Sequence, residues 1–421
     1  MKTFRTLFNH DAYAALKIAE YRWFILARFT LTIGWQMQAV IFGWLIYNYT
    51  KDAFSLGLIG LAEAIPAISI ALFGGHLADK YNRKKLILFF LVMLFSISIL
   101  LTLFTINANA NFEKYGTLPV YVMIFFTGFA RGILAPTIAA FASQLVPKKL
   151  YANASAWSST IWQSGAVTGP AIGGLIYGFY GPYAASAVVC FFIAAAFFAY
   201  TRISSKPVSQ TGPAVPLLES LSSGVKFVFG NQVMLSAITL DLFAVLFGGA
   251  VALLPMFADQ VLGTGAQGLG FLRAAPALGA VIMALALAFR PPVVNAGNKL
   301  LLAVAGFGIC MILFALSKNF YLSFALLALS GMLDSVSVVI RSTIMQTLTP
   351  DAMRGRVSAV NTIFIGSSNE IGAFESGLAA RLLGLVPSVI FGGTMTLLVV
   401  LSAYKFAPSL RKLNLATAGK T

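Results

Sequence analysis

Charged side chains are scarce in this sequence of 421 residues. Only 10% of its residues are Asp, Glu, Lys or Arg, whereas 59% are hydrophobic. Soluble domains usually carry about 25% charged residues. The composition therefore excludes an ordinary soluble protein and is typical of a protein that crosses a membrane many times.

Cysteine and histidine are almost missing as well. Cys190 and Cys310 both fall in apolar runs, and His10 and His76 are the only histidines. These four residues provide neither a disulfide framework nor the ligand spacing of a metal site. The sequence also lacks a nucleophile elbow and a phosphate-binding glycine loop. We therefore predict no metal, no cofactor and no enzymatic activity.

The positive charges are more abundant than the negative ones, with 29 Lys and Arg against 13 Asp and Glu. A net charge of +16 can indicate a nucleic-acid partner, but most of these cations fall on alternate segments between hydrophobic runs. Cytoplasmic loops of membrane proteins carry such an excess of Lys and Arg. The charge therefore predicts membrane topology, with both termini in the cytoplasm, and no nucleic-acid partner.

Long apolar runs make up most of the chain, and about 20 apolar residues suffice for one helical crossing. The runs predict an all-α membrane protein with twelve transmembrane helices. A segment at 202–230 with Pro207, Pro213 and Pro216 separates two sets of six. We expect an N-terminal bundle over 1–201, a cytoplasmic linker over 202–230 and a C-terminal bundle over 231–421. The predicted crossings are 23–49, 55–76, 86–106, 118–146, 156–180, 183–201, 231–257, 267–289, 299–317, 319–347, 357–383 and 386–406.

The two sets of helices resemble one another in sequence. One constant shift places Gly128 on Gly331 and Pro147 on Pro350, and it also aligns glycines of the fifth and eleventh crossings. Parallel repeats of six helices, related by an axis along the membrane normal, are one way in which transporters are built.

A short basic turn follows the second crossing. It runs from Gly75 to Lys85 and contains Asp79, Arg83 and three lysines. These residues resemble the loop signature between the second and third crossings of major facilitator transporters, although Asn82 stands where that family usually has glycine. An acid before such a turn can cap the next helix or latch two helices through an arginine. We expect Gly75, Asp79 and Arg83 to belong to a conformational gate.

The fifth crossing contains Gly165, Gly169, Pro170, Gly173 and Gly174. This pattern resembles the fifth-crossing signature of major facilitator antiporters, which are exporters. Small residues four apart also allow two helices to pack closely, and proline adds a bend. We assign Gly169 and Pro170 to the gate, with plain helix packing as the alternative.

Over nearly its whole length the chain resembles the twelve-helix major facilitator subgroup that includes enterobactin exporters and macrolide efflux proteins. The segments Leu26–Phe29 and Gln346–Val357 support this resemblance, together with the basic turn. The resemblance implies a monomer in the inner membrane of a bacterium, in contact with lipids, that moves a small molecule and protons.

Ionisable residues inside the predicted crossings are candidates for function, because each costs at least about 2.5–3.5 kcal/mol to insert. Apart from residues within two positions of the end of a crossing, nine charged residues occur: Arg28, Glu63, Arg131, Asp241, Arg273, Asp334, Arg341, Glu370 and Glu375.

The repeat places Arg131 of the fourth crossing on Asp334 of the tenth. In major facilitator folds both crossings line the central cavity, so the resemblance predicts that these opposite charges face one another near the membrane midplane. Burial favours the neutral form of a carboxylate, and a nearby arginine favours its charged form. Such a pair can therefore take up and release a proton, or it can be a permanent ion pair that holds helices together.

A slightly different shift places Glu63 on Arg273, each just before a proline, Pro66 or Pro276. Helix kinks at proline leave polar backbone groups that can accompany a charge. The sequence does not choose among Glu63, Asp241 and Asp334 as the proton carrier. We assign Asp334, Arg131, Glu63 and Asp241 to proton coupling, and Arg28, Arg273, Arg341, Glu370 and Trp35 to substrate binding.

These observations predict a proton-coupled exporter of an amphipathic organic molecule, such as a siderophore or a drug, that works by alternating access. Two alternatives remain. One is an importer or symporter that uses the same acids, and the other is an uncoupled lipid flippase or structural membrane protein.

Overall fold

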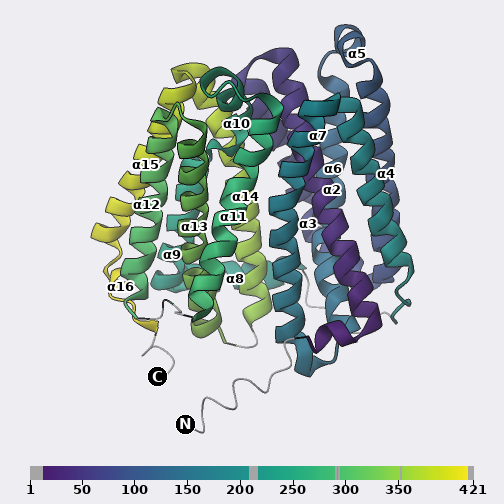
Figure 1. The fold of residues 1–421 in the computed structure, drawn as a ribbon. Coiled ribbons are helices and arrows are strands. Elements are labelled where there is room, and N and C mark those ends of the chain that lie inside the picture. The colour runs from purple at the N-terminus through teal and green to yellow at the C-terminus, as the bar shows by residue number, and fades with distance from the viewer. Residues whose placement is uncertain (1–12, 208–216, 290–291, 293, 351–352, 416–421) are drawn as a thin grey trace.

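The computed structural model describes residues 13–207, 217–289, 292, 294–350 and 353–415, and these residues form helices and no β-strand. The long helices run side by side, and the described chain begins and ends at the same end of the bundle (Figure 1). We call this the termini end, which carries Tyr81, Pro147 and Lys412, and the opposite end the far end, which carries Lys51, Gly181 and Asp259.

The helices are α2 (Ala19–Thr50), α3 (Ala53–Lys80), α4 (Arg83–Ile106), α5 (Ala108–Tyr115), α6 (Leu118–Leu145), α7 (Tyr151–Thr201), α8 (Leu217–Gly230), α9 (Gln232–Gly248), α10 (Leu254–Met256), α11 (Gly265–Phe289), α12 (Ala296–Leu316), α13 (Phe320–Leu348), α14 (Arg354–Leu383), α15 (Leu385–Phe406) and α16 (Pro408–Arg411).

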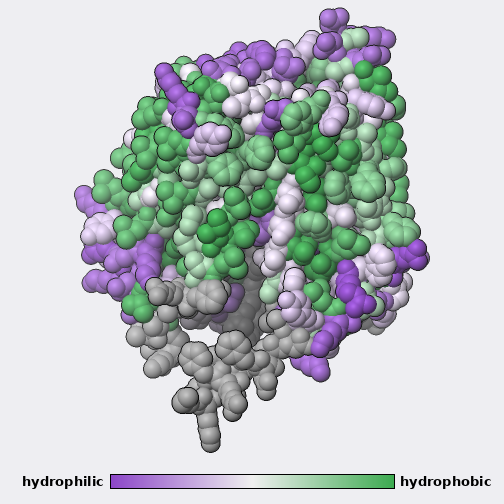
Figure 2. Space-filling view, in the orientation of Figure 1, coloured by the Kyte–Doolittle hydropathy of each residue, from purple (hydrophilic) through white to green (hydrophobic). Residues whose placement is uncertain are grey.

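Ten helical segments of the described chain are long and apolar enough to cross a membrane. One of them, α7, contains two crossings, because Gly181 interrupts its helical backbone with a φ of 82°. The more polar α14 has 30 residues and packs beside α3 and α9. These elements agree with the predicted all-α architecture of twelve crossings. On the face shown in Figure 2, a broad apolar belt lies between hydrophilic residues near the two ends of the molecule.

The seventh predicted crossing, at 231–257, differs from the expectation of one regular helix. Regular α-helix ends at Gly248, and a 3₁₀ turn (Ala250–Leu253), α10 and a π-helical turn (Phe257–Val261) follow. Two adjacent glycines and Pro255 account for this break, since glycine weakens a helix and proline lacks a donor. The irregular segment brings Asp259 to the far end.

Side-chain caps define where several helices begin. Asp52 accepts a hydrogen bond from the backbone of Ser55 at the start of α3, and Asn82 caps α4 in the same way. Asn231 and Asn319 cap α9 and α13. Short polar side chains satisfy the free N–H groups of a first helical turn. Asn82 therefore caps α4 from an extended conformation. The sequence had suggested Asp79 as a possible cap for this helix.

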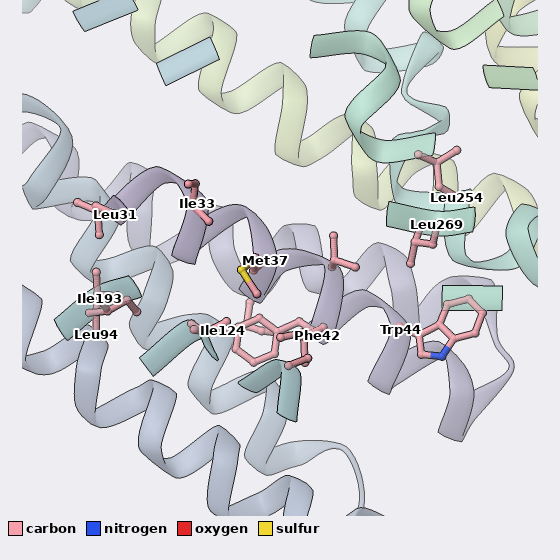
Figure 3. Packing of buried hydrophobic residues seen from close by; sticks show 14 of the residues in the cluster. Leu31, Ile33, Met37, Phe42, Trp44, Leu94, Ile124, Ile193, Leu254 and Leu269 are labelled. Carbon is pink, nitrogen blue, oxygen red and sulfur yellow. The ribbon is translucent and has the colours of Figure 1, made fainter. Parts of the chain in front are cut away.

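The helices pack in two groups. One contains α2 to α7 and the other α9 to α16, and we call them the N-group and the C-group. Helix α2 is buried on most of its surface. Figure 3 shows Leu31 of α2 near Leu94 and Ile193, and Met37 and Phe42 near Ile124, all within the N-group, while Trp44 lies toward the C-group.

The N-group and C-group meet through two main helix pairs, α3 with α14 and α7 with α11. Both pairs rely on glycine. A side chain at Gly57 would collide with the backbone of Gly377, and one at Gly174 would collide with the backbone of Gly270. All four glycines lie toward the far end of their helices, so the groups are held together closely there.

Candidate functional site

Arg131 lies near the middle of α6 and connects the N-group with the C-group. Its Nη1 contacts a carboxylate oxygen of Glu63 on α3 at 2.6 Å and one of Glu370 on α14 at 3.3 Å. The guanidinium also lies 5.7 Å from the ring centre of Trp35 on α2. Four helices therefore converge on one cation.

The helix backbone explains this position. Gly128, one turn before Arg131, lies directly against the backbone oxygen of Glu63, where any side chain would collide. Gly331, which the repeat aligns with Gly128, lies in the same way against the backbone of Pro276. Small residues allow such close approach of membrane helices. The repeat thus preserves the crossing of α6 with α3 in the crossing of α13 with α11.

Arg273 of α11 completes the central cluster, which we define as Trp35, Glu63, Arg131, Arg273 and Glu370. Its guanidinium donates to the backbone oxygen of Ala39 on α2 at 3.0 Å and interacts electrostatically with Glu63 and Glu370. Two cations thus balance two carboxylates, which lowers the cost of holding charge inside a membrane.

The central cluster is open to a space within the protein. Arg131 keeps 48% of its side-chain surface exposed, although it lies roughly 20 Å from the start of α6 at Leu118. Glu63 and Glu370 are 21% and 20% exposed. A charged group at this depth with so much free surface borders open space between the helices.

The predicted contact between Arg131 and Asp334 is not formed. Asp334 instead lines a void of about 10 Å³ between α9, α12 and α13, together with Asp241 and Ser337. Repeat symmetry gives equivalent positions within each group of helices, and equivalence does not require contact. Arginine is long enough to reach acids on neighbouring helices, and Arg131 does so.

Asp241 and Arg341 form a second ion pair, at 2.7 Å, inside the C-group. Their side chains are only 7% and 5% exposed, and the Arg341 Nε also contacts Ser337. Arg341 follows Asp334 by seven residues, which is two helical turns, so the two residues share one face of α13. However, Arg341 is enclosed and paired in this conformation, so it does not present its charge to a ligand as we had expected.

Arg28 has different surroundings. It lines a cavity of about 500 Å³ at the termini end, between α2, α6 and α7, with Ser155, Ser158, Ser159 and Trp162. Its buried Nε has no hydrogen-bond partner, and Arg28 forms no ion pair within the described residues. The site therefore offers a cation and several hydroxyl groups to an incoming ligand.

The basic turn is fixed to the N-group. Arg83 donates to the backbone oxygen of Ala140 on α6 at 3.1 Å, and Asn82 and Lys84 contact the end of α7 and the chain just after it. Gly75 belongs to α3, but its local packing and the side chain of Asp79 lie outside the described part of the structure. Their gate role stays a prediction.

The glycines of the fifth crossing pack against two helices. Gly165, Gly169 and Gly173 lie against α2, whereas Gly174 meets α11 of the C-group. The backbone oxygen of Pro170 also lies against Gly270. Close helix packing therefore accounts for the motif, and the same contacts place Pro170 where the two groups meet.

Asp259 was missed by the sequence analysis. Its carboxylate accepts a hydrogen bond from the Tyr47 hydroxyl at 2.6 Å and pairs with Lys51 at 3.1 Å. Tyr47 and Lys51 belong to the N-group and Asp259 to the C-group, so we call these three residues the far-end latch. An acid in a short π-helical turn that pairs with the lysine after α2 gives no periodic signal in the sequence.

The sequence profile of the Major Facilitator Superfamily matches residues 24–373. The chain therefore belongs to this family of membrane transporters. It is 27% identical over 397 residues to the enterobactin exporter EntS of Shigella flexneri, covering 92% of this chain and 93% of that protein.

Solved structures show the same fold. The POT family transporter PepTSo superposes with a TM-score of 0.74 at 11% identity, covering 94% of this chain and 98% of that one. A D-xylose–proton symporter superposes with a TM-score of 0.70 at 15% identity, covering 93% and 99%. The protein is thus a multi-pass transporter of small molecules and not an enzyme.

Proposed function

We propose that this protein is a proton-coupled exporter that moves an amphipathic organic molecule, such as a siderophore or a drug, by alternating access. It works in the inner membrane of a bacterium as a monomer, with both termini in the cytoplasm. Bundles 1–201 and 231–421 rock about the central cluster, and the segment 202–230 connects them.

The observation that carries this proposal is the position of Arg131 between Glu63 and Glu370. Because one acid belongs to each group of helices, a movement of the groups changes the contacts of Arg131. A proton on Glu63 or Glu370 removes one negative charge from a balanced cluster and weakens its hold on the arginine. Protonation and domain movement are therefore coupled at this point.

The buried charges inside the C-group, Asp241, Arg341 and Asp334, are less suited to this coupling, although the sequence analysis assigned both acids to it. All three belong to the C-group and can move together when that group moves. We propose that they stabilise the C-group and that the central cluster carries the proton.

The surroundings of Arg28 support the proposal that the transported molecule carries an anionic group. The cavity at Arg28 opens at the termini end, and the basic turn at that end supports a cytoplasmic orientation. Trp162 provides an aromatic surface beside the cation and the serine hydroxyl groups. An aromatic molecule with an acidic group fits this combination. Relatives of this chain are named enterobactin exporters, which agrees with such a substrate.

Reconstituted vesicles test the proposal, with enterobactin as the first probe and an amphipathic drug as the second. A pH gradient is imposed, and substrate and proton movements are recorded together. We expect substrate and protons to move in opposite directions, and Arg131→Ala to abolish both fluxes. Movement of substrate with the proton would identify a symporter, and movement without any proton flux would identify an uncoupled carrier.

A further inference from the structure

A groove runs along the outer face of the C-group at the termini end, away from the central cluster. It lies between α12 and α15 and has a volume of about 740 Å³. Leu302 and Leu401 line its walls and are 71% and 62% exposed. Figure 1 shows α12, α15 and α16 together at this edge of the molecule.

The groove extends from the membrane surface into the apolar belt. It begins at Asn295, just before α12, and reaches Ala305, roughly 15 Å further along the helix. The hydrocarbon core of a membrane is about 30 Å thick, so the groove reaches about half of that depth. Its wall therefore faces lipid chains for most of its length.

The mouth of the groove is positively charged. The Arg411 guanidinium lies 4.7 Å from the ring centre of Tyr404, and Lys412 follows it directly. Neither cation forms an ion pair with a carboxylate of the described chain. The Asn295 side chain is also at the mouth and does not cap α12.

The cations are held over the groove by the packing of α16. The Gly297 N–H donates to the backbone oxygen of Leu413 at 3.3 Å, and a side chain at Gly297 would collide with Leu410. Ser409 also donates to Gln232 of α9 at 2.9 Å. Arg411 and Lys412 therefore occupy fixed positions and are not part of a free tail.

We propose that this groove binds an anionic phospholipid. One acyl chain lies between α12 and α15, and the phosphate lies between Arg411 and Lys412 with Asn295 beside it. Basic residues at the membrane surface attract anionic lipids, and an apolar slot below them selects a lipid over a soluble phosphate. The site is independent of the proposed transport function, because it lies outside the path between the two groups of helices.

The test measures binding of phosphatidylglycerol and phosphatidylcholine to the purified, delipidated full-length protein, by native mass spectrometry and by titration. We expect Arg411→Gln/Lys412→Gln to weaken phosphatidylglycerol binding roughly thirty-fold and to leave phosphatidylcholine binding nearly unchanged. Lys148→Gln/Lys149→Gln is the matched control, since it removes the same charge from exposed positions at the same end of the N-group. This control should bind as the wild type does.

A second variant tests the groove without changing its charge. Leu401→Trp places a large ring between α12 and α15, and we expect it to reduce phosphatidylglycerol binding as well. Inorganic phosphate should not displace the lipid. Equal binding of both lipids, equal losses in both charge variants, or full binding by Arg411→Gln/Lys412→Gln would each overturn the proposal.

Discussion

The guanidinium of Arg131 lies 3.3 Å from the carboxylate of Glu370, although 239 residues separate them in the chain. One residue belongs to the N-group and the other to the C-group. The same Arg131 nitrogen also contacts Glu63 within the N-group at 2.6 Å. Separation of the groups must therefore transfer Arg131 from two acids to one.

The far-end latch should bias the protein toward the conformation described here. Replacing Asp259 by Asn removes the ion pair with Lys51 and weakens the hydrogen bond from Tyr47. Exposed ion pairs contribute about 0.2–1 kcal/mol, so we expect up to about a five-fold rise in the population with an open far end. Spin labels at Tyr180→Cys and Leu382→Cys, with the native cysteines replaced by serine, report the distance across that end.

Glu113→Gln is the control for the latch. Glu113 lies on α5 at the same end and has no ion pair within the described residues. Its replacement should leave the distance distribution unchanged. An unchanged distribution in Asp259→Asn would show that the latch contributes nothing to closure.

Gly174 should be essential for closing the far end. In Gly174→Val a side chain meets the backbone of Gly270 and Ala266, which cannot move aside easily. Overpacking of this kind costs about 1–3 kcal/mol, which here falls on the closed conformation. The same spin labels should show a longer distance. Gly366→Ala is the control, since its added methyl group meets no atom within 4 Å, and a normal distance in Gly174→Val would contradict the assigned contact.

Arg28 should determine affinity for acidic ligands. Charged hydrogen bonds contribute about 1.5–3 kcal/mol, so we expect Arg28→Gln to weaken binding of an anionic substrate roughly 10-fold to 100-fold. Binding of a neutral analogue should change little. Equilibrium binding to the purified protein measures both. Arg22→Gln, on the exposed face of the same helix, is the matched control, and equal losses in both variants would reject a specific role for Arg28.

The Asp241–Arg341 pair should contribute to stability through its burial. Removing one member leaves an uncompensated charge, which costs about 3–5 kcal/mol. Asp241→Asn should therefore lower the thermal stability of the detergent-solubilised protein. Asp241→Leu/Arg341→Met removes both charges and should lower it less. If the double variant were the less stable of the two, burial of an unpaired charge would not be the cause.

The fold could be predicted from the sequence because the length of an apolar run and the charge of a loop can each be read from one short stretch of the chain. Gly181 separates the fifth and sixth crossings where the hydropathy pattern indicated, and the glycines at 128 and 331 occupy equivalent crossings as the repeat predicted. The break after Gly248 was not predicted, because glycine occurs in many membrane helices without ending them.

The partners of the buried charges could not be predicted in the same way. The repeat correctly identified Arg131 and Asp334 as equivalent, yet it suggested a contact that is absent. Contacts depend on which helices are neighbours and on the direction of each side chain. Helix α14 lies against α3 rather than α6, and this packing brings Glu370 to Arg131.

Proton flux in Glu370→Gln tests the central claim most directly, with Asp334→Asn as the matched variant inside the C-group. Both replacements remove one carboxylate and keep the shape of the side chain. In vesicles with a pH gradient, the account predicts that substrate-driven proton flux is lost in Glu370→Gln and retained in Asp334→Asn. Retained flux in Glu370→Gln would contradict coupling through the central cluster. Loss in Asp334→Asn alone would show that Asp334, inside the C-group, carries the proton.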